Sequence, residues 1–283
     1  MSTVVDNHAA GPTVELCDAG LSYGARRLWQ HLDLSVAPGE FLAVLGPNGS
    51  GKTSLIRVLL GLSTLSSGRV LVCGAVPRRG SNVIGYIPQQ KGFDRDLPVR
   101  GGDLVGLGLD GHRWGIGLPS AGRRRRIARA VDAVGAARFA GAPIGQCSGG
   151  EQQRLRIAQA LIGDPALLLC DEPLLSLDLK HQQDVVTALD QRRREASTAV
   201  VFVTHEINPI LPVTDRVLYL VGQRWAIGTP DDVLTSETLS ELYRTRVDVL
   251  RVQGRIVIVG APNSVRPDDA HLEPVDDAGV VHR

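Results

Sequence analysis

The sequence has no excess of charge of either sign and no clustered cysteines. Its 31 basic and 30 acidic residues leave a formal net charge of +1, so no overall field favours nucleic acid or an acidic partner. The four cysteines stand far apart, at positions 17, 73, 147 and 170, and no pair has the spacing of metal ligands. We therefore expect reduced thiols in a cytoplasmic protein, and no nucleic-acid partner.

Long apolar runs are also missing. No stretch approaches the roughly 18 consecutive apolar residues that mark a membrane-spanning helix. Residues 1–12 lack the apolar core of a signal peptide and contain Asp6, so we expect a disordered tail there. If the protein serves membrane transport, other chains must supply the pore.

One segment, Gly46–Thr53, carries a clear chemical pattern. It reads Gly-Pro-Asn-Gly-Ser-Gly-Lys-Thr, which fits the phosphate-binding loop G-x-x-x-x-G-K-[S/T]. The apolar run Phe41–Leu45 before it predicts a buried strand, and Ser54–Leu62 after it predicts a helix. Glycines let backbone N–H groups turn toward phosphate oxygens, and the helix N-terminus adds partial positive charge. A chance glycine-rich turn would lack these flanks, so we predict binding of a nucleoside triphosphate.

Within this loop the expected roles differ. Lys52 should reach the β- and γ-phosphates, and the Thr53 hydroxyl should bind Mg²⁺. The residues expected to contact the nucleotide here are Gly46, Pro47, Asn48, Gly49, Ser50, Gly51, Lys52, Thr53 and Ser54.

A second apolar strand, Leu167–Cys170, ends in two acids. An acid at the carboxyl end of a strand faces the ligand crevice of an open α/β sheet. Asp171 is placed to hold Mg²⁺ through water, and Glu172 is placed to polarise the attacking water as a general base. Two acids that merely cap a turn are the alternative, which a phosphate loop in the same chain disfavours.

The order of elements indicates the fold class. Strands alternate with helices, so we predict an α/β fold of the P-loop NTPase type, with a mostly parallel doubly wound core sheet. Two strands ahead of the phosphate loop predict an antiparallel β layer. After Phe93 the strand-like apolar runs stop and helical spacing appears, which predicts an inserted helical subdomain. The expected divisions are a tail at 1–12, an ATPase domain at 13–245 with the helical subdomain at about 93–160, a β-hairpin extension at 246–260 and a disordered tail at 261–283.

The segment Cys147–Arg154 predicts a second anion site. Ser148, Gly149 and Gly150 offer a hydroxyl and exposed amides at a helix N-terminus, and Glu151 completes a capping box. Here the chain resembles the ATP-binding cassette (ABC) ATPases, whose signature Leu-Ser-Gly-Gly-Gln/Glu matches from Ser148 onward. Cys147 replaces the family's Leu, and a small apolar Cys suits that position.

The resemblance extends from about Val14 to Leu242 and implies further site residues. Tyr23 matches the aromatic residue that stacks on adenine. Gln89 matches the glutamine that senses Mg²⁺ and water, with the adjacent Gln90 as the alternative. His205, after an apolar strand, matches the switch histidine that contacts the γ-phosphate.

The family also implies a head-to-tail homodimer. Each ATP would lie between the phosphate loop of one subunit and the Ser-Gly-Gly of the other, and the loop Ser176–Asp178 would cross to the partner subunit, where Asp178 would contribute to the nucleotide site. ATP binding would close this dimer and hydrolysis would release it.

Two functional classes compete for such a chain. Non-transport ABC ATPases usually carry two cassettes in tandem or a long coiled-coil insertion, and this sequence has neither. The resemblance therefore implies the ATPase subunit of a transporter, working with integral membrane permease subunits at the cytoplasmic face of the cell membrane. Segments outside the motifs, such as Asp96–Pro98 and Gly228–Pro230, resemble the zinc/manganese importer ATPases, which act indirectly with an extracytoplasmic metal-binding protein. An iron-chelate or other importer is the alternative.

The basic run Arg123–Arg126 is the other distinctive feature. We expect a solvated helix face there, with contact to anionic lipid or a membrane subunit as the alternative.

Overall fold

The computed structural model describes residues 11–89, 92–111 and 120–260. The predicted tails fall outside these ranges, apart from Gly11 and Pro12, and so does Gln90. In the described residues no helix is both long and apolar enough to cross a membrane.

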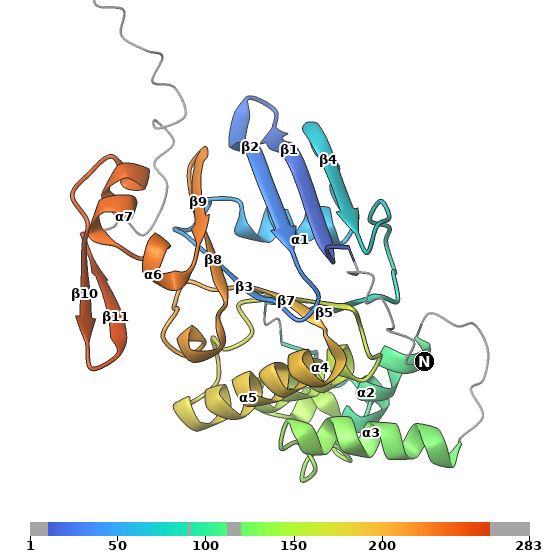
Figure 1. Cartoon of the computed structure of the whole chain (residues 1–283). Coiled ribbons are helices and arrows are strands. Elements are labelled where there is room, and N and C mark those ends of the chain that lie inside the picture. The colour runs from blue at the N-terminus through green and yellow to red at the C-terminus, as the bar shows by residue number, and fades with distance from the viewer. Residues whose placement is uncertain (1–10, 90–91, 112–119, 261–283) are drawn as a thin grey trace, which may run out of the picture.

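A six-stranded sheet forms the centre of the molecule (Figure 1). Its strands run parallel except for the edge strand β9, which is antiparallel to β8. In spatial order they are β5 (Ile84–Ile87), β6 (Leu167–Asp171), β7 (Ala199–Val203), β3 (Phe41–Leu45), β8 (Arg216–Val221) and β9 (Arg224–Gly228). The predicted fold class, α/β with a mostly parallel core sheet, is confirmed.

Alternate side chains of the central strand point into two separate cores. Phe41 and Ala43 pack with residues of α4 and α5, whereas Leu42 and Val44 pack with residues of α1 and of the first strands. A strand buried on both faces is apolar at every position. This explains why Phe41–Leu45 is an uninterrupted apolar run.

The predicted antiparallel layer is present beside the main sheet. Strand β1 (Val14–Tyr23) pairs with both β2 (Arg26–Val36) and β4 (Ser67–Val72). Helix α1 (Lys52–Leu59) contributes to the same core as this layer and the main sheet. The helix begins two residues before the predicted 54–62. It also ends before residue 62, because Gly61 has a φ of +66°, a left-handed conformation that ends the helix.

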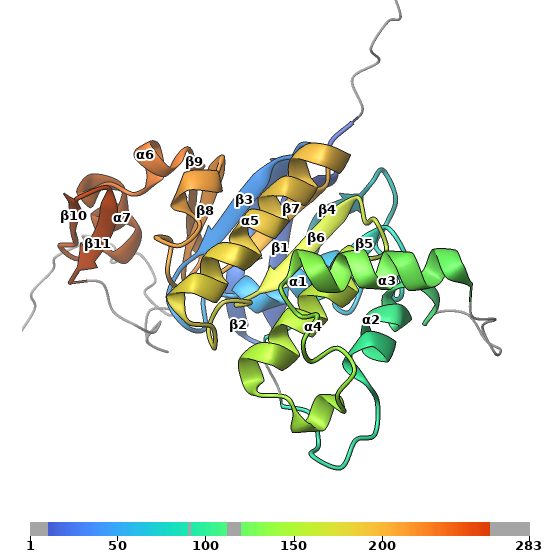
Figure 2. The ribbon, with the colours of Figure 1, turned by 90° about the horizontal axis from the view of Figure 1, so that it is seen from below.

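The helices of the predicted subdomain gather at one end of the sheet (Figure 2). They are α2 (Gly101–Asp110), α3 (Ala121–Ala133), η1 (Ile144–Gln146) and α4 (Gly149–Leu161). The sequence did not predict α2 as a separate helix, because it contains four glycines. They allow close packing, since a Cβ at Gly108 would lie 2.1 Å from the Gln159 carbonyl oxygen of α4.

The expectation of a solvated arginine face is wrong in part. Arg123 Nε donates to Asp110 Oδ2 at 2.7 Å, and Arg126 Nη2 donates to Asp164 Oδ2 at 2.6 Å. Arg123 therefore links α3 to the last residue of α2, and Arg126 links it to the segment that follows α4. Arg124, Arg125 and Arg126 are exposed, as expected, whereas Arg123 is partly buried.

The C-terminal elements lie at the opposite end (Figures 1 and 2). After α5 (Leu179–Ala196) and η2 (Leu211–Val213), the chain forms α6 (Pro230–Val233) and α7 (Ser236–Tyr243), which the sequence did not predict. The predicted hairpin follows as β10 (Asp248–Val252) and β11 (Arg255–Val259), which pair only with each other among the described strands. We call these two strands the C-terminal hairpin.

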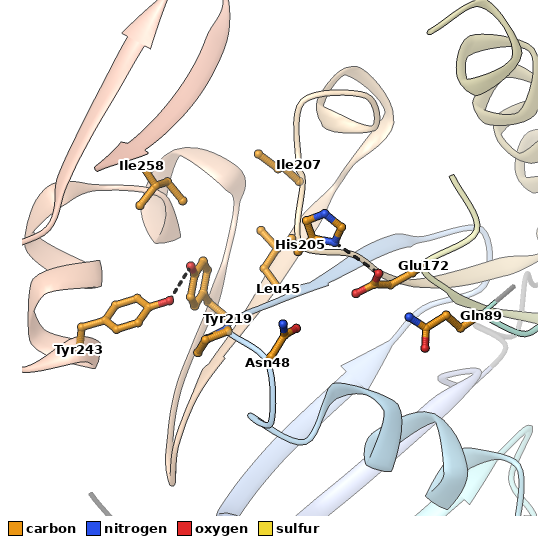
Figure 3. A pocket seen from close by; sticks show the side chains of 11 residues that line it. Leu45, Asn48, Gln89, Glu172, His205, Ile207, Tyr219, Tyr243 and Ile258 are labelled. Carbon is orange, nitrogen blue, oxygen red and sulfur yellow. Dashed lines mark hydrogen bonds and ion pairs between the residues drawn. The ribbon is translucent and has the colours of Figure 1, made fainter. Parts of the chain in front are cut away.

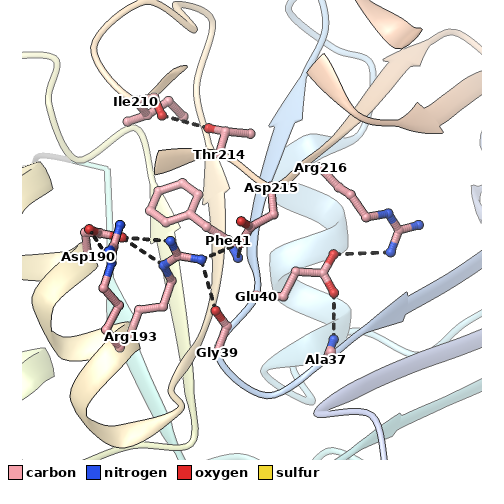
Figure 4. Close-up of polar contacts among 11 residues, drawn as sticks. Ala37, Gly39, Glu40, Phe41, Asp190, Arg193, Ile210, Thr214, Asp215 and Arg216 are labelled. Atoms are coloured by element: carbon pink, nitrogen blue, oxygen red, sulfur yellow. Dashed lines mark hydrogen bonds and ion pairs between the residues drawn. The ribbon is translucent and has the colours of Figure 1, made fainter. Parts of the chain in front are cut away.

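A polar network fixes the amino ends of the central strands (Figure 4). The Phe41 N–H donates to Asp215 Oδ2 at 2.8 Å, and the Arg193 guanidinium donates to the same oxygen and to the Gly39 carbonyl oxygen. Arg193 also pairs with Asp190 within α5. Asp215 thereby joins α5 to the starts of β3 and β8.

We expect Asp215→Ala to destabilise the fold. The substitution leaves the buried Phe41 N–H and the Arg193 cation without their shared acceptor, which costs about 1–3 kcal/mol. Urea denaturation should show a lower midpoint. Asp231→Ala is the matched control, because Asp231 pairs with Arg251 with 82% of its side chain exposed, and such pairs contribute about 0–1 kcal/mol. Equal losses in both variants would contradict this role for Asp215.

Candidate functional site

The phosphate loop occupies the turn from β3 into α1. Its glycines adopt positive φ angles of 140° at Gly46, 81° at Gly49 and 97° at Gly51. A Cβ at Gly46 would lie 2.0 Å from the Leu220 carbonyl oxygen, and one at Gly51 would lie 2.8 Å from Trp29 Nε1. Side chains at these two positions are therefore excluded by backbone angle and by space.

Two polar side chains of the phosphate loop, those of Ser50 and Lys52, are buried. Lys52 Nζ donates to the carbonyl oxygens of Gly46 at 2.7 Å and Pro47 at 2.9 Å. Burial lowers the pKa of Lys52, and the charges of Glu172 and Asp171 oppose that shift. The Ser50 hydroxyl is buried and has no hydrogen-bond partner among the described residues. A cation and an unsatisfied hydroxyl within a glycine cradle suit a bound phosphate group.

The two acids follow β6 at the same edge of the sheet. Thr53 Oγ1 donates to Asp171 Oδ1 at 3.3 Å, which joins the end of the loop to the first acid. Burial raises the pKa of Asp171, and the charge of Glu172 adds to the rise, whereas the Thr53 hydrogen bond and the Lys52 charge oppose it. A divalent cation at this point would stabilise the ionised carboxylate.

Glu172 sits in a constrained backbone position and faces His205. Its φ of 46° is left-handed, and its N–H donates to the Val203 carbonyl oxygen of β7 at 2.9 Å. His205 Nδ1 lies 3.3 Å from Glu172 Oε2. The Glu172 side chain is 13% exposed and that of His205 is 54% exposed. The acid is therefore shielded while the histidine reaches into open space.

A cavity of about 540 Å³ lies beside these residues (Figure 3). Glu172, His205 and Gln89 line it together with the start of the phosphate loop. The far wall comes from Tyr219 and from the C-terminal elements, as Figure 3 shows. This cavity adjoins the start of the phosphate loop, at Gly46, Pro47 and Asn48.

A second cavity of about 360 Å³ adjoins the other side of the loop. It is lined by Tyr23, Lys52, Thr53 and Ser54, and it shares Gln89 and other residues with the first cavity. Tyr23 is half exposed and its hydroxyl lies 3.4 Å from Ser63 Oγ, so its ring is accessible from this cavity. The predicted adenine, phosphate and cation residues are therefore brought together.

The Ser-Gly-Gly segment lies at the N-terminus of α4. Ser148 caps α4, with its N–H donating to Glu151 Oε2 at 2.7 Å and its hydroxyl accepting from the Glu151 N–H at 3.4 Å. Ser148 and Gly149 are exposed, and the segment lines neither cavity. Asp178 caps α5, pairs with His181 and is likewise absent from both cavity walls. The structure thus confirms the capping box, and neither Ser148 nor Asp178 lines the two cavities beside the phosphate loop.

Sequence reasoning missed several residues that shape the site. Arg26 Nη2 donates to the Gly49 carbonyl oxygen at 3.1 Å, which braces the phosphate loop from the antiparallel layer. Tyr243 and Ile258 complete the wall of the larger cavity. No local pattern marks them, because their contacts join distant parts of the chain.

The arrangement suits a nucleotide that carries a divalent cation. Gln89 lines both cavities, Thr53 lines the smaller one, and the Thr53 hydroxyl lies 3.3 Å from Asp171 Oδ1. All three side chains carry oxygen atoms, which are the ligands that Mg²⁺ prefers. Lys52 supplies positive charge, and Glu172 supplies a carboxylate within reach of a water in the larger cavity.

Comparison with known proteins agrees with this geometry. Residues 29–175 match the family model of the ABC transporters. The zinc import ATP-binding protein ZnuC of Roseobacter denitrificans is 34% identical over 233 residues, which are 82% of this chain and 84% of that protein.

Two solved structures are similar throughout most of the chain. An ABC transporter described as metal-chelate type, in an inward-facing conformation, has a TM-score of 0.72 and 27% identity, covering 87% of this chain and 96% of that one. A dimeric ATP-binding cassette in a post-hydrolysis state with ADP and Pi has a TM-score of 0.67 and 27% identity, covering 76% of this chain and 98% of that one. The chain belongs to the ABC transporter family, as an ATP-binding subunit that hydrolyses ATP.

Proposed function

We propose that this ATPase energises a membrane importer for zinc or manganese. The similarity to the zinc import protein ZnuC, over most of both chains, is the observation that carries the proposal. In this proposal the chain lies at the cytoplasmic face of the membrane, bound to integral permease subunits. An extracytoplasmic metal-binding protein acts with them, without touching this chain.

An iron-chelate importer is the second candidate. It is supported by the similarity to the transporter of metal-chelate type, which covers 87% of this chain. The two candidates differ in the metal that rescues growth, which the deletion experiment below measures.

We assign a distinct role to each residue of the site. Lys52 neutralises charge on the transferred phosphoryl group, and Glu172 accepts a proton from the attacking water. His205, held beside Glu172, contacts the terminal phosphate, and Tyr23 stacks on the adenine ring. Mg²⁺, when bound, neutralises charge on the phosphate oxygens, and Thr53, Asp171 and Gln89 would hold it.

We further propose that the site is shared between two copies of the chain. The supporting observation is that Ser148 and Gly149 are exposed at a helix N-terminus and line neither cavity. An exposed helix N-terminus binds anions, so it is suited to meet the terminal phosphate held by a partner. The division into an ATPase domain at 13–245, a helical subdomain at about 93–160 and an extension at 246–260 belongs to the same proposal.

Hydrolysis should depend on Lys52. We expect Lys52→Met to lower kcat by about 10²-fold or more, because the variant loses the cation that stabilises the transferring phosphoryl group. Phosphate release by the purified variant measures this, and its thermal unfolding shows whether the loop still folds. Near-normal turnover in a folded variant would contradict the assigned role.

Glu172→Gln should trap a dimer in the presence of ATP and Mg²⁺. The amide keeps the size of the side chain but cannot accept the proton, so hydrolysis should slow by about 10²–10⁴-fold while binding persists. Size-exclusion chromatography with light scattering measures the dimer. A monomer at saturating ATP would count against the shared site.

Adding Ser148→Arg to Glu172→Gln should abolish the dimer, because a bulky cation would fill the space for the terminal phosphate. Ser120→Arg is the matched control, since Ser120 caps α3 as Ser148 caps α4. The control should leave the dimer intact. A Ser148→Arg double variant that still dimerises would show that Ser148 does not close the site.

The transported species is tested in cells. Deletion of the gene should impair growth under metal chelation, and added zinc or manganese should relieve the defect. The wild-type gene should restore growth, whereas the Glu172→Gln gene should not, because import needs hydrolysis. Relief by an iron chelate, with none from zinc or manganese, would favour the second candidate.

A further inference from the structure

His205 lies in a short connection that is fixed at both ends. The connection leaves the central sheet after β7 and reaches η2, and its two anchor points are Thr204 and Asn208. The position of His205 therefore depends on whatever holds these two residues.

The first anchor belongs to the central sheet. The Thr204 N–H donates to the Val44 carbonyl oxygen of β3 at 3.1 Å. Thr204 Oγ1 also accepts from the Glu206 N–H at 3.1 Å, which closes a tight turn around His205. This end is therefore hydrogen-bonded to the strand that leads into the phosphate loop.

The second anchor belongs to the C-terminal hairpin. Asn208 Nδ2 donates to the Ile256 carbonyl oxygen at 2.9 Å, and the Ile256 N–H donates to Asn208 Oδ1 at 2.8 Å. The side-chain amide thus pairs with the backbone of β11 as a neighbouring strand would. One side chain engages both polar groups of a residue 48 positions away.

Apolar contacts extend this join. Ile207, next to the anchor, is buried in the same core cluster as Ile256, and the inward-facing Val249 and Ile258 of the hairpin pack against that cluster. Tyr219 and Tyr243, whose hydroxyls lie 3.2 Å apart, form an edge-to-face ring pair beside it. The hairpin and His205 consequently border one cavity (Figure 3).

We propose that Asn208 is a positioning residue that couples the C-terminal hairpin to His205, so that the hairpin tunes ATP hydrolysis. The inference rests on the role proposed above for His205. An opening of the hairpin would release one end of the connection and let His205 move away from Glu172. A partner that binds the hairpin could then change the position of His205 and with it the rate of hydrolysis.

This coupling should act on turnover and leave ATP binding unchanged. The cavity that holds Tyr23 and Lys52 is lined by no described residue of the hairpin. Loss of the hydrogen bonds between Asn208 and Ile256 should therefore change kcat while KM for ATP stays constant, which separates positioning from binding.

Asn208→Ala in the full-length chain tests the proposal. We expect kcat to fall about tenfold or more, because a misplacement of about 1 Å in a catalytic group can cost up to about 10²-fold. KM for ATP should stay within about twofold of wild type. Asn208→Asp keeps the acceptor for the Ile256 N–H and loses the donor, so its kcat should lie between the values for wild type and for Asn208→Ala.

Ser240→Ala is the matched control. Ser240 Oγ also makes two backbone bonds to the hairpin region, accepting from the Val247 N–H at 3.0 Å and donating to the Val247 oxygen at 3.2 Å. These bonds lie at the hairpin entrance, away from Asn208. The control should lose thermal stability as Asn208→Ala does, yet keep kcat within about twofold of wild type.

The outcomes separate this inference from the proposed function. A normal kcat in His205→Ala would remove the role of His205 itself. A low kcat in His205→Ala with a normal kcat in Asn208→Ala would overturn only the coupling. Equal losses of kcat in Asn208→Ala and Ser240→Ala would show general loosening and also overturn it. If Asn208→Ala does not fold, a normal kcat in Asn208→Asp overturns the coupling.

Discussion

The pairing register of three parallel strands determines the site. Val203 of β7 lies opposite both Val44 of β3 and Asp171 of β6, so all three strands end at the same level. The phosphate loop, the acid pair and His205 stand at or just after these three strand ends and therefore lie at one edge of the sheet. A slip of one residue in either pairing would turn every buried side chain of that strand to the opposite core. The chemistry therefore depends on the packing of apolar residues that never touch a nucleotide.

Three charged groups lie together at this edge of the sheet: Lys52, Asp171 and Glu172. Lys52 lies buried near two carboxylates, and burial lowers the pKa of Lys52 and raises that of Asp171, because it disfavours the charged form of each. The Lys52 charge and the two carboxylates offset part of one another's desolvation cost, whereas the Glu172 charge adds to that of Asp171. A site of this kind is suited to a ligand that brings both phosphate and a cation, since it then gains partners for both signs.

Local patterns predicted the parts of the fold that are local in origin. The phosphate loop, the Ser148 capping box and the C-terminal hairpin are each defined by neighbours in sequence, and the patterns placed them to within a few residues. Helix α2 escaped prediction because its glycines serve contact with α4, a tertiary reason that outweighs helix propensity. The paired arginines Arg123 and Arg126, and the bond from Asn208 to Ile256, likewise depend on partners that only the fold brings near.

The central position of β3 has a consequence for how the chain folds. This strand comes early in the sequence, yet both of its neighbours in the sheet come late, and the Phe41–Asp215 bond spans 174 positions. During synthesis the phosphate loop therefore emerges long before the strands that hold it in shape. Such high contact order slows folding and leaves apolar edges exposed on the ribosome. A chain truncated before β8 would carry the whole phosphate-loop motif and still lack a working site.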